Sequence, residues 1–332
     1  MIPVPHVELP IATPGVEWRP ATIDDVAGIH DCEQEIAVAD HPHYVVPEED
    51  LSDDFELSYV NLAADTIVAT DVAGRVLGWG LVLMPPGQDT LVRSILIGGV
   101  RPSERGTGLG RQLLRWQEQR GLQQLGASAK TLPGWLMAFV DERADASARL
   151  LRRFEFEVAR YFLELRRDLG EPVPEVALDD KLTVVPFTLE RSAATLAARN
   201  DSFRDHWGSQ PVDDEQWKSF VGRDAFRPEL SFVAIDENDD VVGFVLASVN
   251  EGDWPGQGFS SSYIDLVGVT RAWRKHGIAP ALLAKTLSAI AAAGLDKAVL
   301  DVDSDSPTGA LGLYTGLGFE ESNRSVSYNR VY

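Results

Sequence analysis

The chain has 332 residues, of which 44% are hydrophobic, and this length favours two globular domains over one. Its 51 acidic and 30 basic residues give a formal net charge of −21, which argues against binding to a nucleic-acid phosphate backbone. The charge is compatible with a cationic substrate such as an amine, and the alternative is an ordinary solvated acidic surface. A single cysteine, Cys32, excludes an intrachain disulfide and a cysteine-rich zinc site.

The N-terminal residues 1–15 are rich in proline and predict a loose arm, without the basic and apolar regions of a secretory signal. No apolar run is long enough to span a bilayer, so we expect a cytoplasmic protein that does not bind membranes. A short strand should end at Pro20. Thr22 should then cap a helix whose apolar face carries Val26 and Ile29.

The following stretch, with His41 and His43 and the acidic run 48–54, is expected to form a loop. Two histidines without a supporting set of carboxylates do not make a metal site, so we expect no metal. Residues 66–71 and 75–84 predict a β-hairpin.

A glycine-rich turn joins a strand to a helix in the first half. Residues 95–100 form an apolar run that predicts a buried strand, and residues 111–125 have helical spacing. Between them stands Arg105-Gly106-Thr107-Gly108-Leu109-Gly110. Free backbone N–H groups and the positive end of a helix dipole at such a turn suit a phosphate or pyrophosphate. The alternative is an ordinary strand-to-helix turn.

The second half repeats this order after a polar, proline-containing stretch at 171–180. A strand at 263–269 precedes the turn Arg274-Lys275-His276-Gly277-Ile278-Ala279, and a helix at 280–293 follows it. A side chain at Gly277 would hold an anion away from the backbone. A further helix is expected from Pro307 to residue 317.

Corresponding landmarks in the two halves lie 163 to 169 residues apart, which indicates a duplicated domain. We therefore expect an N-terminal domain at 1–170, a linker at 171–180 and a C-terminal domain at 181–332. The paired landmarks are Pro20 and Pro186, Gly78 and Gly243, Arg105 and Arg274, and Phe156 and Phe319.

The repeated strand, Arg-x-x-Gly-x-Gly/Ala turn and helix make the chain resemble the GNAT superfamily of acyl-CoA-dependent N-acyltransferases. A later motif of that superfamily is matched by Ala310, Tyr314, Gly318 and Phe319, with Ser306 where asparagine is common. The tandem layout and length are similar to mycothiol synthase and its actinobacterial relatives. The resemblance implies an α/β fold of two tandem GNAT-like domains, each with a mixed central sheet flanked by helices.

The resemblance also implies acetyl-CoA, or another acyl-CoA, as the donor and a small-molecule or peptide amine as the acceptor of a monomer or homodimer. Acyl transfer needs a held pyrophosphate, a polarised thioester carbonyl, a base for the amine and an acid for the departing thiolate. The residues expected to bind the cofactor lie in the two turns and at the ends of the strands before them. They are Val267, Gly268, Val269, Arg274, Lys275, His276, Gly277, Ile278, Ala279, Gly98, Gly99, Val100, Arg105, Gly106, Thr107, Gly108, Leu109 and Gly110.

Tyr314 is the expected general acid, by its position in the family motif; the alternative is a half-buried core tyrosine. Mycothiol synthase uses a glutamate on the fourth strand as its base, and Tyr263 occupies that position here. Asp265 lies two residues further on and should share the face of Tyr263, since side chains alternate along a strand. We predict Asp265 as the base, with a chain of water molecules as the alternative.

Three residues are candidates for substrate binding. His206 and Trp207 lie where the substrate-facing helices of the family usually are, although such a pair is more often part of the packing. Glu251 lies in the loop before the strand that carries Asp265.

In the first half, Leu151 occupies the position of Tyr314, and leucine cannot donate a proton. We therefore expect an N-acetyltransferase whose C-terminal domain is catalytic. The N-terminal domain, which keeps the glycine-rich turn, is expected to bind acyl-CoA without turnover; the alternative is a structural relic. One alternative is an acyl-CoA-binding sensor or partner-binding protein in which both sites are silent. Within the enzyme class, a mycothiol synthase-like enzyme is a candidate, although Tyr263 counts against it, and aminoglycoside, polyamine and peptide acceptors stay open.

Overall fold

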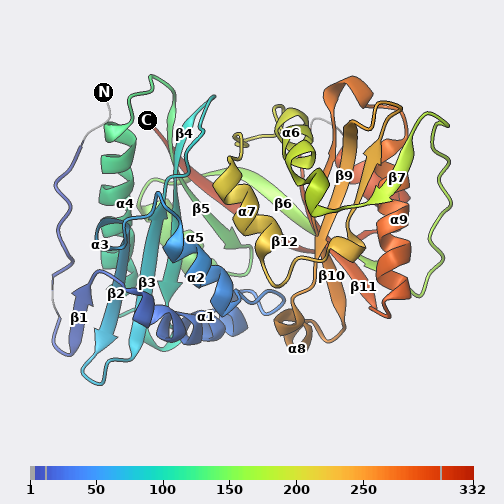
Figure 1. The fold of residues 1–332 in the computed structure, drawn as a ribbon. Helices are drawn as coiled ribbons and strands as arrows, with labels where there is room; N and C mark the ends of the chain where they lie inside the picture. The colour runs from blue at the N-terminus through green and yellow to red at the C-terminus, as the bar shows by residue number, and fades with distance from the viewer. Residues whose placement is uncertain (1–3, 12, 307–308) are drawn as a thin grey trace. The chain divides into compact units, whose positions relative to one another are not determined.

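The computed structural model describes residues 4–11, 13–306 and 309–332. The chain forms two compact units, the first made of Met1–Tyr161 and Ser325–Tyr332 and the second of Phe162–Arg324. Each unit has one mixed β-sheet with helices on both faces (Figure 1), which confirms the expected α/β class and tandem arrangement.

The sheet of the first unit has the strand order β1-β2-β3-β4-β5-β12. Its strands are β1 (Val16–Arg19), β2 (Thr66–Asp71), β3 (Val76–Leu83), β4 (Val92–Val100), β5 (Gly134–Asp141) and the end of β12 (Glu320–Val331). Strands β4 and β5 are parallel, and the other described pairs are antiparallel. Its helices are α1 (Val26–Asp40), α2 (Glu48–Glu56), α3 (Leu62–Asp65), α4 (Leu109–Ala127) and α5 (Asp145–Arg153).

Two hydrophobic clusters cover the two faces of this sheet. Helices α1 and α2 pack on one face, around Ile29 and Leu51, and helices α4 and α5 pack on the other, around Leu113 and Leu151. Strand β3 is therefore buried along nearly its whole length. This burial explains why its sequence is continuously apolar rather than alternating.

The second unit repeats this plan with the strand order β6-β11-β10-β9-β8-β7. Its strands are the end of β6 (Glu157–Asp168), β7 (Thr183–Pro186), β8 (Phe232–Ile235), β9 (Val241–Ser248), β10 (Ser261–Val269) and β11 (Lys297–Asp303). Its helices are α6 (Ser192–Ser202), α7 (Asp214–Gly222), α8 (Trp254–Gln257), α9 (Ile278–Ala292) and α10 (Ala310–Gly316). Helices α6 and α7 cover one face, and α9 and α10 cover the other.

The division between the units passes within two long strands. Residues 162–168 of β6 pair with β11, and residues 325–331 of β12 pair with β5. The expected boundary at residue 170 follows a change in composition, whereas the compact units follow this strand pairing.

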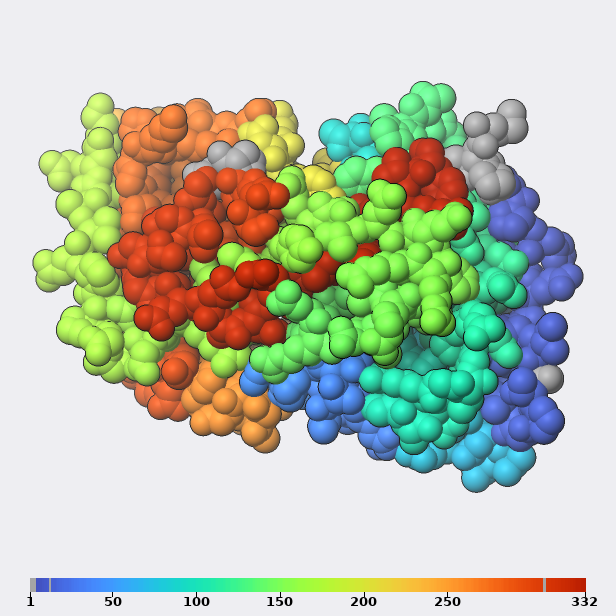
Figure 2. Space-filling model, turned by 180° about the vertical axis from the view of Figure 1, so that it is seen from behind, coloured from blue at the N-terminus to red at the C-terminus, as the bar shows by residue number. Residues whose placement is uncertain are grey.

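The segment expected to be a linker, residues 171–180, lies against the second unit. Val173 and Leu178 pack on the core that includes α9. The segment runs beside α9 in both views, coloured yellow-green against orange (Figures 1 and 2). Its polar composition therefore does not make it a free spacer.

The prediction of a loop at the acidic run 48–54 is wrong, because these residues form part of helix α2. Three acidic residues in the first turn of α2 complement the positive end of the helix dipole. Leu51 and Phe55, four residues apart, are both buried on the α1 face. Side chains at this spacing lie on one face of a helix, which is the signal that the charge of the run concealed.

Helix α7 was not expected from the sequence. Its N-terminus has a reciprocal capping box between Asp213 and Gln216, and Trp217 anchors it in the core. The expected helix start at Pro307 lies outside the described residues, and α10 begins at Ala310. In the described part of the chain, no helix has the length and apolarity to cross a membrane.

Close packing of α9 on β9 depends on Gly243. A Cβ atom at this position would lie 2.6 Å from Ile278 Cγ2. We expect Gly243→Ala to lower the free energy of unfolding by about 1–3 kcal/mol, because the helix must move to accept the methyl group. Urea unfolding followed by circular dichroism would measure the change.

Gly312→Ala is the matched control. This glycine lies inside α10, and a Cβ atom there would meet no described heavy atom within 4 Å. Removing a flexible glycine from an open helical position should leave the stability unchanged or raise it by about 0.5–1 kcal/mol. Equal destabilisation by both substitutions would contradict the packing argument.

Candidate active site

The turn after β10 has the conformation of an anion-binding loop. Arg274 is extended, Lys275 and Gly277 have positive φ angles of 66° and 74°, and α9 begins directly afterwards. In the described part of the chain, the backbone N–H groups of residues 275–279 donate no hydrogen bond. Free N–H groups at the N-terminus of a 15-residue helix form a site suited to a phosphate.

The turn after β4 in the first unit repeats this conformation. Gly106 and Gly108 have positive φ angles of 84° and 104°, and α4 begins at Leu109. A Cβ atom on either glycine would meet no described heavy atom within 4 Å, so both backbones are open. At Gly277 the nearest described atom would be the Ala177 carbonyl oxygen at 3.9 Å, so no described side chain blocks the second turn.

An aspartate near the end of the first helix of each unit holds the arginine of the turn. Arg105 donates to both carboxylate oxygens of Asp40 at 2.8 Å. Arg274 donates to Asp205 at 2.8 Å, and Arg271 donates to the other oxygen of Asp205 at 2.7 Å. These arginine side chains therefore fix the turns, which leaves the backbone N–H groups to meet an anion.

The two parallel strands beside each turn stop pairing part-way along. In the second unit, β10 and β11 pair only at residues 261–263 and 297–299. In the first unit, β4 and β5 pair only at 92–95 and 134–137. Beyond these points one edge of β10 and one edge of β4 have no strand paired to them. Half of the backbone N–H and C=O groups of β10 bond to β9, and half of those of β4 bond to β3, so the alternate groups face the open edge.

The strand ends expected to bind the cofactor, 267–269 and 98–100, lie along these open edges. Two of their glycines also have a packing reason. A Cβ atom on Gly268 would lie 2.6 Å from Ser202 Oγ in α6, and one on Gly98 would lie 2.3 Å from the Trp79 carbonyl oxygen. The close approach of neighbouring elements therefore accounts for these glycines without a ligand.

Tyr314 lies in α10, with 7% of its surface exposed, and its ring meets the edge of Phe319 at 5.8 Å. Burial raises the pKa of its phenol to about 12. The hydroxyl is therefore protonated at any physiological pH, as a proton donor must be. Its role as the acid stays a prediction.

Asp265 occupies a β-bulge in β10. Ile264 pairs with Ala247 and Leu266 with Leu246, so Asp265 is the extra residue between two ladder positions. The bulge interrupts the regular alternation that was expected to place Asp265 on the face of Tyr263. Tyr263 instead donates from its hydroxyl to Asp301 at 2.7 Å.

The carboxyl group of Asp265 is largely desolvated, with 13% of its side chain exposed. Burial raises its pKa to about 6, and the opposing influence of Arg223, 3.4 Å away, is too small to restore the ordinary value. Its Oδ2 atom is buried without a hydrogen-bond partner in the described part of the chain. A carboxylate with a pKa just below neutrality and a vacant acceptor position has the properties of a general base.

Two of the three candidate substrate residues, His206 and Trp207, lie together in the turn after α6, and the third, Glu251, lies in a separate turn before β10. The rings of His206 and Phe203 are 5.4 Å apart, and those of Trp207 and Phe162 are 6.4 Å apart. Phe162 pairs across β6 and β11 with the residue at the carboxyl end of β11. Glu251 begins an exposed 3₁₀ turn, Glu251–Asp253. Their contact with a substrate stays a prediction.

The first unit has apolar residues at both positions where the second has a titratable group. Leu96 corresponds to Asp265 when the glycine-valine ends of β4 and β10 are matched, and it is buried. Leu151, which corresponds to Tyr314, is buried in the α4 and α5 core. The pairing of β3 with β4 also runs from Gly78 to Leu83 without a bulge.

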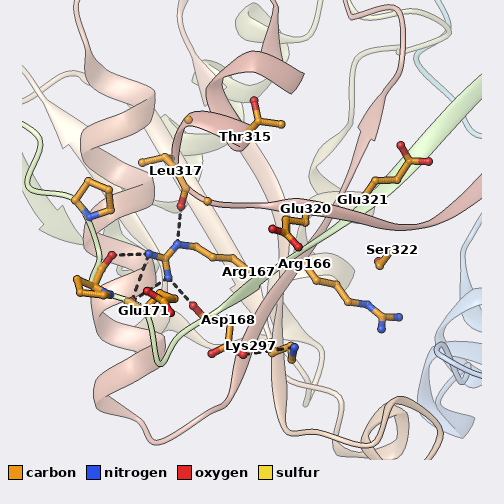
Figure 3. A pocket seen from close by; sticks show the side chains of 14 residues that line it. Arg166, Arg167, Asp168, Glu171, Lys297, Thr315, Leu317, Glu320, Glu321 and Ser322 are labelled. Carbon is orange, nitrogen blue, oxygen red and sulfur yellow. Dashed lines mark hydrogen bonds and ion pairs between the residues drawn. The ribbon is translucent and has the colours of Figure 1, made fainter.

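A cavity of about 680 Å³ lies elsewhere in the second unit (Figure 3). It is bordered by the end of β6, the start of β11 and the α10–β12 turn, whereas the anion-binding loop follows the opposite, carboxyl end of β10. Its buried Arg167 donates to the carbonyl oxygens of Leu317 and Pro172 at 2.6 and 2.8 Å. This arginine joins α10 to the segment at 171–180, so we do not assign the chemistry to this cavity.

The family model for the acetyltransferase (GNAT) family matches residues 193–319. A mycothiol acetyltransferase of Frankia casuarinae is 31% identical over 77% of this chain and 72% of its own length. A mycothiol acetyltransferase of Renibacterium salmoninarum is 26% identical over 79% of this chain and 74% of its own.

Solved structures share the whole fold. The crystal structure of a GCN5-related N-acetyltransferase from Sphaerobacter thermophilus has a TM-score of 0.71 at 23% identity and covers 95% of both chains. A tandem GNAT protein from the clavulanic acid biosynthesis pathway has a TM-score of 0.68 at 17% identity, over 95% of this chain and 98% of its own.

The raised pKa of Asp265 predicts a pH-dependent cost to stability. Because the folded-state pKa of about 6 lies above the ordinary 3.8, ionisation destabilises the fold as the pH rises through this window. We expect Asp265→Asn to raise the free energy of unfolding by about 1–2 kcal/mol at pH 7.5 and to lose this gain near pH 4. Urea unfolding at the two pH values would measure it.

Glu251→Gln is the control, because it neutralises an exposed carboxylate on the segment before β10. It should leave the unfolding free energy unchanged at both pH values. A gain for Asp265→Asn that is the same at pH 4 and pH 7.5 would show that desolvation of the charge is not its cause.

Proposed function

The chain belongs to the GNAT family of acetyltransferases and is an N-acetyltransferase; from that premise we propose that its second unit transfers an acetyl group from acetyl-CoA to a primary amine. One contrast carries the proposal. Both units have an open anion-binding turn, but only the second has titratable groups, Asp265 and Tyr314, where the first has leucines.

The residues of the turn fit the pyrophosphate of acetyl-CoA. The free N–H groups of residues 275–279 and the N-terminus of α9 would hold its negative charge. The unpaired edge of β10 next to β11 offers backbone donors to the thioester carbonyl, at Val267 to Val269. Acetyl-CoA, when bound, supplies the activated acyl group.

Asp265 is the proposed base. With a pKa of about 6 its carboxylate is ionised at neutral pH, and the unpartnered Oδ2 can accept a proton from the amine as nitrogen attacks the thioester carbonyl. A water molecule between Oδ2 and the amine would serve the same transfer. The new bond is nitrogen to carbonyl carbon, and the bond that breaks is carbon to sulfur.

Tyr314 is the proposed acid. Its phenol would give a proton to the departing sulfur, so that free thiol leaves and the amide product remains. Since its pKa is about 12, this group should produce no alkaline limb in the rate profile below pH 10.

The first unit is proposed to bind acetyl-CoA without turnover. Its turn is at least as open as that of the second unit, with glycine at two positive-φ positions, whereas the second has Lys275 at one of them. Leu96 and Leu151 offer neither a base nor an acid.

The names of the relatives make an amine on the route to mycothiol the first acceptor to test. The position of Tyr263, where the glutamate of mycothiol synthase is expected, argues for testing polyamine, aminoglycoside and peptide amines alongside it. A net charge of −21 favours cationic acceptors of any of these kinds.

Removal of either proposed group should slow the chemical step. We expect Asp265→Asn and Tyr314→Phe each to lower kcat on the order of 100-fold while the KM for acetyl-CoA stays nearly constant. Thiol release from acetyl-CoA with a panel of amines would measure both constants.

Tyr263→Phe is the matched control, since it removes a phenol that already donates to Asp301. It should keep most of the activity. Unchanged turnover in Tyr314→Phe, or no acceptor giving turnover above hydrolysis, would refute the proposed chemistry.

Calorimetric titration would test the division of labour between the units. We expect two acetyl-CoA sites per chain in the unmodified protein. Gly277→Val and Gly108→Val should each remove one site, because a β-branched side chain is strained at these positive φ angles and covers the N–H groups of the turn. Only Gly277→Val should abolish turnover. If Gly108→Val loses turnover while its second unit still binds acetyl-CoA, the proposal that the second unit alone is catalytic is refuted.

A further inference from the structure

We propose that Arg223 is a positioning residue for catalysis, which orients the Asp265 carboxylate so that one oxygen faces the acceptor amine. This inference rests on the proposed role of Asp265 as the base. Arg223 directly follows Gly222, the last residue of α7, which is the helix that the sequence did not predict.

The two oxygens of the Asp265 carboxylate have different surroundings. Arg223 donates from Nη2 to Oδ1 at 3.4 Å. Oδ2 is buried, and in the described part of the chain it accepts no hydrogen bond. A buried, unsatisfied carboxylate oxygen costs free energy, and an N–H group of the acceptor would satisfy it.

The bulge in β10 explains why the orientation of the Asp265 carboxylate depends on a contact outside the strand. Asp265 is the extra residue of β10, so the regular ladder does not fix its side chain by alternation. An external contact must then select one orientation, and Arg223 supplies it. The first unit has neither the bulge nor a carboxylate at Leu96.

Arg223 is itself held in place. Its Nε donates to the carbonyl oxygen of Phe220 at 3.3 Å, and its guanidinium lies 4.8 Å from the centre of the Phe220 ring. That ring packs on Trp217 at 5.6 Å and on Phe226 at 5.7 Å. The aromatic cluster thus fixes the guanidinium, and the guanidinium can fix the carboxylate.

Two side chains influence the charge of Asp265: Arg223, from the end of α7, and Ser248, from β9. Both lower its pKa against the effect of burial, Arg223 mainly through its positive charge and Ser248 through its polar side chain. Without Arg223 the pKa of Asp265 would rise further above its ordinary value. The base would then be protonated at neutral pH, and its orientation would be lost with its charge.

The test is the pH profile of kcat/KM for the acceptor amine. In Arg223→Gln we expect the acidic limb to move upward by about one pH unit or more, with the KM for acetyl-CoA unchanged. Arg223→Lys keeps the charge but has no planar fork, so it should leave the limb near its original position with a reduced plateau. Ser248→Ala should move the limb in the same direction by less.

Arg227→Gln is the matched control. This arginine lies four residues further on and donates to the carbonyl oxygens of Asp224 and Phe226. Its substitution should leave the limb in place. If Arg223→Gln lowers the plateau without moving the limb, or if Arg227→Gln moves it equally, the positioning role is refuted.

Asp265→Asn separates this inference from the function on which it rests. Full activity in Asp265→Asn would refute Asp265 as the base, and the positioning role with it. A 100-fold loss in Asp265→Asn, combined with an unmoved limb in Arg223→Gln, would refute the positioning role alone. If Arg223→Gln does not fold, Arg223→Lys and Ser248→Ala provide the same test. The positioning role is refuted if, in both variants, the acidic limb of the kcat/KM profile stays in place and the plateau is as high as in the unmodified protein.

Discussion

Each unit depends on two neighbouring parallel strands that separate part-way along the sheet. Because β10 and β11 share only three paired positions, the rest of β10 keeps an unused edge of backbone donors and acceptors in the middle of a folded unit. Such an edge costs free energy unless something satisfies it. The bulge at Asp265 interrupts the pairing of the same strand with β9, and the turn at Arg274 follows the end of that strand, so β10 positions both the anion-binding turn and the proposed base.

Much of this arrangement could be predicted from the sequence, because it rests on local patterns. Glycines at fixed positions between a strand and a helix identified both turns, and their spacing revealed the duplication. What could not be predicted depends on contacts between distant residues. The bulge that turns Asp265 away from regular alternation, the pairing of Arg223 with Asp265 and the anchoring of Arg105 by Asp40 all join separate elements. The sequence predicts a loop where α2 lies, because the six charged residues of this helix outweigh the two buried ones, Leu51 and Phe55.

The two units share the arginine-supported turn but differ at the two positions where the second unit has titratable side chains. Arg105 and Arg274 are each bound by an aspartate near the end of the first helix of their unit, so the turn is supported in the same way in both halves. The replaced positions are few and local. Leu96 and Leu151 lie in the core of the first unit as ordinary buried apolar residues, and neither side chain can accept or donate a proton.

The exchange of terminal strands restricts how this protein can be cut into pieces. A fragment that begins at residue 181 would lack the part of β6 that pairs with all seven residues of β11, and would expose that strand as an open edge. A fragment that ends at residue 170 would likewise leave β5 without its β12 neighbour. Bare edges of this length invite aggregation. Expression of either half alone therefore requires that the missing strand be supplied, for example by grafting residues 325–332 onto the first fragment through a designed connection.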